Sequence, residues 1–146
     1  MPATLDVQVS GWIDGQRIPD RFALGKLGDP MEMSDNISPE INWSGAPAAT
    51  RSIAIIVSDP DVPSVADDVN QPDREVPADL PRITFTHWVL VDLPASTTSI
   101  AEGAASNGVT ARGKSIGESL GGITGPNAYT SWIDGDPDMG GVYGGY

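Results

Sequence analysis

Three segments of the chain carry the hydrophobic patterns of β-strands. Residues 5–10 alternate apolar with polar side chains, which is typical of a strand with one buried face. Residues 53–57 are apolar at every position, and such a run predicts an interior strand covered on both faces. Residues 85–93 form the third predicted strand and contain the only histidine of the chain, His87.

The remaining sequence is typical of turns and irregular connections. With 17 Gly and 13 Pro in 146 residues, the composition suits an all-β protein with many turns. Residues 64–82 are polar and rich in proline, and predict a long irregular excursion between two strands. Residues 95–128 show little periodicity, and Gly121-Gly122 argues against a long helix there. We therefore predict a mostly antiparallel all-β domain.

Charge and composition exclude several classes of function. The net charge of -12 repels nucleic acid and anionic membranes, although a small anion can still bind in a locally polarised pocket. The absence of cysteine excludes disulfides and thiolate chemistry, and a single histidine argues against a histidine-rich metal site. No stretch approaches the ~20 apolar residues of a membrane span, and no signal peptide is visible, so we expect a cytoplasmic protein.

Two carboxylates and the histidine form the main candidate site. Asp59 and Asp61 lie in the segment Asp-Pro-Asp-Val-Pro that follows the apolar run, where the prolines end the strand. In an extended strand, His87 shares a face with Phe85, whereas Trp88 points the other way. A carboxylate beside an imidazole favours the charged imidazolium, and such a pair could hold phosphate or carboxylate. The alternatives are a core histidine bonded to a carbonyl group, and aspartates that only cap turns.

A second acidic segment, residues 134–138, begins like a calcium loop. It lacks the later glutamate and flanking helices, so we interpret it as an acidic surface loop and keep calcium as an alternative. We assign no metal ligand, no cofactor and no catalytic residue.

Three ordered motifs in residues 35–95 resemble one family. Residues 38–47 are similar to the S-P-x-x-x-W-x-G-x-P segment of phosphatidylethanolamine-binding proteins, residues 59–63 match their D-P-D-x-P signature, and His87-Trp88 matches their histidine strand. The bacterial and archaeal branch, termed Raf-kinase-inhibitor-like, is the most similar. The resemblance implies a large antiparallel sheet packed on a smaller one, with few short helices. It also implies a pocket lined by Asp59, Asp61 and His87, with Phe85 at its wall.

The chain departs from the family pattern at its end. The family continues with a loop and a G-x-H-x-Y strand, whereas residues 143–146 match only the start of that loop. We therefore expect residues 1–146 to form a single domain without its C-terminal part. A second chain or further C-terminal residues would supply a strand beside the one that carries His87. Association with further copies of the same chain, as a homo-oligomer, is another expectation.

The resemblance favours a binding or regulatory protein over an enzyme. Its expected ligand is a small anion of the phosphate or phosphoethanolamine type. One alternative is a hydrolase in which His87 acts as a base oriented by Asp59 or Asp61. The other is a regulator that binds proteins through its acidic loops.

Overall fold

The computed structural model describes residues 4–28 and 30–146. Its strands in chain order are β1 (Asp6–Val9), β2 (Gly25–Lys26), β3 (Glu32–Met33), β4 (Ile41–Ser44), β5 (Ser52–Pro63), β6 (Arg82–Pro94), β7 (Ser99–Ile100), β8 (Gly117–Ser119) and β9 (Gly122–Thr124). The helices are the 3-10 turn η1 (Asp20–Phe22) and the single-turn α1 (Tyr129–Trp132). In the described residues no helix is long and apolar enough to cross a membrane.

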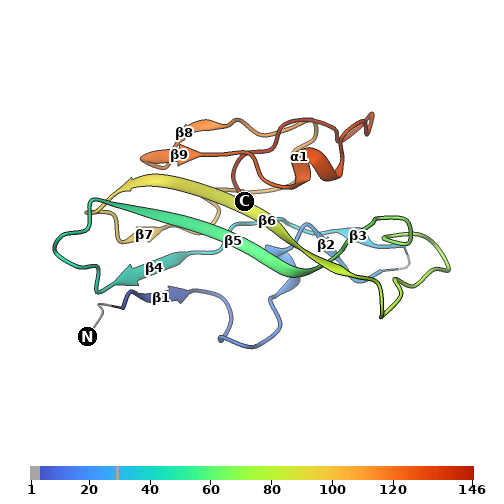
Figure 1. Cartoon of the computed structure of the whole chain (residues 1–146), viewed down its shortest axis with the longest axis horizontal. Helices are drawn as coiled ribbons and strands as arrows, with labels where there is room; N and C mark the ends of the chain where they lie inside the picture. Colours follow the sequence, from blue (N-terminus) through green and yellow to red (C-terminus); the bar gives the residue numbers. More distant parts are fainter. Residues whose placement is uncertain (1–3, 29) are drawn as a thin grey trace.

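Every strand pairing is antiparallel, and the strands form two main sheets. The larger sheet has the order β5-β6-β9-β8, the smaller has the order β1-β4-β7, and β2 pairs with β3 separately. Figure 1 shows the long β5 and β6 crossing the middle of the molecule, with β1, β4 and β7 on one side. The predicted all-β fold, a larger sheet packed on a smaller one with few short helices, is confirmed.

The hydrophobic core lies between these two sheets. Trp88, Leu90 and Leu93 of β6 are fully buried, and they pack against side chains of the smaller sheet, including Ile41 and Trp43 of β4. Trp43 lies in the first motif of the family resemblance and Trp88 in the last. The two tryptophans therefore have a structural role, because they join the sheets that hold the cavity described below.

The β5 strand differs from its prediction. It lies at the edge of the larger sheet and pairs only with β6 in the part of the chain that the structure describes. Ile53 points into the core and is 8% exposed, whereas Ile56 points outward and is 64% exposed. The prediction of an interior strand covered on both faces was wrong, because a continuous apolar run does not itself show that both faces are covered.

Two irregularities interrupt the β5–β6 pairing next to the candidate site residues. Val57 pairs with Trp88 and Ser58 with Thr86, so His87 is an extra residue in a β-bulge. Further along, Asp59 pairs with Phe85 and Val62 with Ile83, which leaves Pro60 and Asp61 outside the regular register. A bulge changes the direction in which nearby side chains point. Both irregularities lie where β5 and β6 leave the core.

Both sides of β6 are already occupied around His87. One side pairs with β5, and on the other side β9 pairs with Leu90 and Val91. The chain after β9 continues this contact, since the N–H of Gly125 donates to Val89 O and the N–H of Ala128 donates to Thr86 O. Residues 122–128 therefore run beside β6 from Val91 to Thr86.

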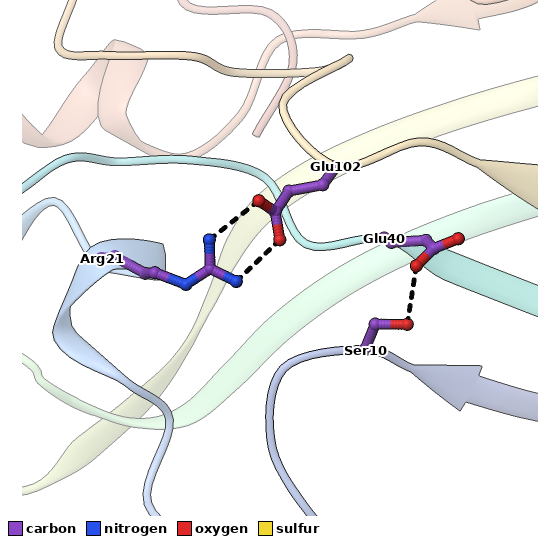
Figure 2. A network of polar contacts seen from close by, with 4 residues as sticks. All are labelled: Ser10, Arg21, Glu40 and Glu102. Atoms are coloured by element: carbon purple, nitrogen blue, oxygen red, sulfur yellow. Dashed lines mark hydrogen bonds and ion pairs between the residues drawn. The ribbon is translucent and has the colours of Figure 1, made fainter.

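An ion pair ties η1 to the loop after β7. The guanidinium of Arg21 donates two hydrogen bonds to the Glu102 carboxylate, at 2.8 and 2.7 Å, as Figure 2 shows. Nearby, Ser10 Oγ donates to Glu40 at 2.8 Å. The Arg21 guanidinium also lies 4.2 Å from the centre of the Phe22 ring. The contacts of Arg21 hold the η1 segment, and Phe22 of η1 lines the cavity described below.

Candidate functional site

A cavity of about 610 Å³ lies where β5 and β6 leave the core. Its walls come from η1 and the residues after it, the end of β5, the loop before β8, α1 and the last residues of the chain. Apolar side chains such as Ile18, Phe22 and Met31 form much of the lining. The volume is in the range of small-molecule sites, which combine apolar walls with a few polar groups.

The structure brings Asp59 and His87 to this cavity from adjacent strands. Both residues line it, together with Val57 and Pro60. Asp59 comes from the last core-facing position of β5, and the bulge in β6 turns His87 toward the same space. The two side chains that the sequence placed together therefore do lie at one site.

Phe85 lies behind His87 and outside the cavity lining. It is 4% exposed, and its ring centre is 5.0 Å from that of His87 and 4.9 Å from that of Tyr129. Trp132 of α1 packs against the Phe85 ring edge-on at 5.7 Å. We call Phe85, His87, Tyr129 and Trp132 the aromatic cluster; it fixes the orientation of the imidazole.

Asp61 lies apart from the other candidate residues. Its side chain is 84% exposed and is 3.5 Å from the guanidinium of Arg82, and it is not among the described residues that line the cavity. Its main-chain N–H donates to Asp59 Oδ1 at 2.8 Å. Asp61 therefore supports the site through its backbone, because this turn hydrogen bond fixes the carboxylate of Asp59.

The imidazole of His87 is mainly neutral at pH 7. Burial lowers the pKa of His87 below its ordinary 6.5, and the negative charge of Asp59 opposes this effect without overcoming it. The charged imidazolium expected from the sequence is therefore not the favoured form. The same burial, with the charge of Asp59, raises the pKa of the Tyr129 hydroxyl above 10.0. The site thus presents one carboxylate beside two neutral groups able to donate hydrogen bonds.

Several cavity residues were not found from the sequence. They are Lys114, Asn127, Tyr129, Tyr143 and Tyr146. All come from the final third of the chain, where hydrophobic periodicity is weak. A polar aromatic or cationic residue in such a segment has no local pattern that marks it as a site residue. These residues are recognised as site residues only in the folded structure, where the segment lies next to β5 and β6.

The acidic segment 134–138 forms a turn. Asp136 Oδ1 accepts the main-chain N–H groups of Asp138 and Met139, at 2.9 and 2.8 Å, and these bonds lower the pKa of Asp136. In residues 4–28 and 30–146, no three acidic, histidine or cysteine side chains gather as a metal site would require. The Asp136 carboxylate thus caps its own loop.

Replacing Asp59 with asparagine is expected to lower the pKa of His87 further. The charge of Asp59 is the one influence that raises this pKa, and asparagine keeps the oxygen that accepts the Asp61 N–H while removing the charge. Because the chain has one histidine, a proton NMR titration measures its pKa directly. The matched control Asp61→Asn removes the same charge and should leave the pKa unchanged. Equal shifts in both variants would contradict the placement of Asp59.

The fold and cavity define a β-sheet protein with a site of ligand size. The sequence model of the phosphatidylethanolamine-binding protein family matches residues 9–141. The chain belongs to this family. The resemblance seen in the three sequence motifs is therefore confirmed.

Relatives of the chain occur in bacteria and archaea. It is 31% identical over 93 residues to the UPF0098 protein YbhB of Escherichia coli, covering 64% of this chain and 46% of that protein. It is 34% identical over 101 residues to a UPF0098 protein of Aquifex aeolicus, covering 68% and 43%. For a UPF0098 protein of Methanothermobacter thermautotrophicus the identity is 27% over 104 residues, covering 71% and 52%. The chain spans about half the length of these relatives.

Proposed function

We propose that this protein binds a small phosphate-bearing ligand, phosphate itself or a phosphoethanolamine-type head group, in the cavity at the end of β5 and β6. The observation that carries the proposal is that Asp59 and His87 line one cavity of about 610 Å³ from adjacent strands. Membership of a family named for phosphatidylethanolamine binding supports it. The binding function is proposed for the cytoplasm, the location that the sequence predicts.

The polar groups of the cavity suit a ligand that carries both charges. Among the described residues, the His87 ring nitrogens and the Tyr129 hydroxyl form no hydrogen bond with another residue. Every fully buried side-chain nitrogen or oxygen of these residues does have a partner, so the unpaired His87 and Tyr129 atoms are accessible. These groups therefore reach the cavity space and can donate to phosphate oxygens. The Asp59 carboxylate repels an anion but attracts an ammonium group. A phosphoethanolamine head group carries both a phosphate and an ammonium group, so it can bind the donors of His87 and Tyr129 and the Asp59 carboxylate together.

Calorimetric titration with phosphoethanolamine and with inorganic phosphate tests this proposal. We expect the wild-type protein to bind phosphoethanolamine more tightly, because only this probe carries an ammonium group for Asp59. His87→Ala should weaken both affinities at least about tenfold, since a hydrogen bond to a charged group contributes about 1.5–3 kcal/mol. Asp61→Asn serves as the control and should bind as the wild type does.

Two results would contradict this proposal, and each points to a different conclusion. Binding of neither probe by folded wild-type protein would refute the proposed function. Release of phosphate from phosphoethanolamine by the wild type, lost in His87→Ala, would instead establish the hydrolase in which His87 acts as a base.

A further inference from the structure

We propose that Lys114 supplies the positive charge that holds the anionic group of the ligand in this cavity. The inference rests on the proposed function and assigns a residue that neither the motifs nor the candidate pair include. It concerns the charge of the bound anion, which the neutral His87 does not balance.

Lys114 is the one lysine or arginine among the described residues that line the cavity. Its Nζ donates to Ser106 Oγ at 2.7 Å and to the main-chain oxygen of Tyr146 at 2.6 Å. An ammonium group has three N–H donors, so one remains for a ligand. Within residues 4–28 and 30–146, no Asp or Glu side chain lies within ion-pair distance of Lys114. The described side chains thus contribute no carboxylate that would balance this charge.

The backbone fixes Lys114 in this position. Its N–H donates to Val142 O at 2.9 Å, and its carbonyl oxygen accepts the N–H of Gly144 at 3.0 Å. The preceding Gly113 has a φ of +102°, and a Cβ there would collide with Val142 O. Only glycine therefore lets the two segments approach this closely. The lysine side chain leaves a rigid backbone and is ordered before a ligand binds, which reduces the entropy lost on binding.

The partial burial of Lys114 favours an anionic ligand. Burial lowers the pKa of Lys114 below its ordinary 10.5, because a cation loses hydration when it is taken from water. An anion placed against the free N–H would offset that loss with a charge-assisted hydrogen bond, which is about twice as strong as a neutral one. Phosphate is such an anion.

The experiment compares two lysine variants by calorimetric titration with inorganic phosphate and with phosphoethanolamine. Lys114→Gln should weaken both affinities at least about tenfold, as expected from the loss of one charge-assisted hydrogen bond. Lys26→Gln is the matched control, since it removes the same charge from a lysine that pairs with Glu32 at 3.2 Å outside the cavity lining. It should stay within about twofold of the wild type, because a surface ion pair contributes little.

A measurement on the wild type makes the test independent of how the variants fold. The chain contains two lysines, Lys26 and Lys114, and mass spectrometry can follow their acetylation separately. Inorganic phosphate should slow the acetylation of Lys114 and leave that of Lys26 unchanged. Unslowed acetylation in a protein that binds phosphate, or full affinity in Lys114→Gln, would overturn the role of Lys114 alone. A wild type that binds neither probe would overturn the proposed function as well.

Discussion

Alanine at Ile53 is expected to lower the free energy of unfolding by about 2–5 kcal/mol, the usual range for deleting a buried isoleucine side chain. Alanine at Ile56 is expected to change it by no more than about 0.5 kcal/mol, as for an exposed position. The two residues lie three positions apart on β5, and they are 8% and 64% exposed. The difference between them therefore isolates burial from residue type and from strand propensity.

Urea unfolding followed by tryptophan fluorescence measures both changes. Equal m-values in the wild type and the variants would show that the comparison concerns stability and not compactness. A loss of 2 kcal/mol or more in Ile56→Ala would contradict the arrangement, since it would mean that the outer face of β5 is covered in solution.

The strands could be predicted where the hydrophobic pattern is long. The apolar run 53–57 and the segment 85–93 both became parts of long paired strands, β5 and β6. The hydrophobic pattern could not show which strands lie beside β5 in the sheet. Ile56 belongs to the same apolar run as Ile53 and differs from it only in the face to which it points. Its exposure follows from the sheet order, which is set by contacts between distant segments.

The candidate site was predicted in part because two of its residues lie in motifs at strand ends. Asp59 and His87 reach the same cavity, but simple alternation places Phe85 and Trp88 on opposite faces of β6. In the structure their pairing partners, Asp59 and Val57, share a face of β5, so Phe85 and Trp88 share one too. The bulge at His87 shifts the alternation by one residue. A bulge of this kind has no signature in the hydrophobic pattern.

The rest of the site comes from segments with no regular pattern. Lys114 lies before the short β8, and Tyr129 begins a single-turn helix. The hairpin between β8 and β9 turns at Leu120 and Gly121, which have φ values of +55° and +85°. Leucine is a rare residue at such a φ, so the residue types at this turn do not predict it clearly. The hairpin is nevertheless what returns the chain to β6 and places Tyr129 against Phe85.

Alanine at Phe85 is expected to have the largest effect of any single change near the site. Its ring is buried and contacts His87, Tyr129 and Trp132, and its loss should lower the free energy of unfolding by about 3–5 kcal/mol. The same change should raise the pKa of His87 toward 6.5. Burial is the main cause of the lowered value, and removal of the neighbouring ring admits water to the imidazole. Urea unfolding and the NMR titration of the single histidine measure the two effects.

Trp43→Ala is the control, because Trp43 is also a buried aromatic residue and does not line the cavity. Its ring packs in the core between the two sheets, in a cluster that does not include His87. This variant should lose a similar amount of stability and leave the pKa of His87 where it is. A pKa that moves equally in both variants would show that the titration reports general loosening of the fold. A pKa that moves only in Phe85→Ala would show that the aromatic cluster itself keeps the imidazole neutral.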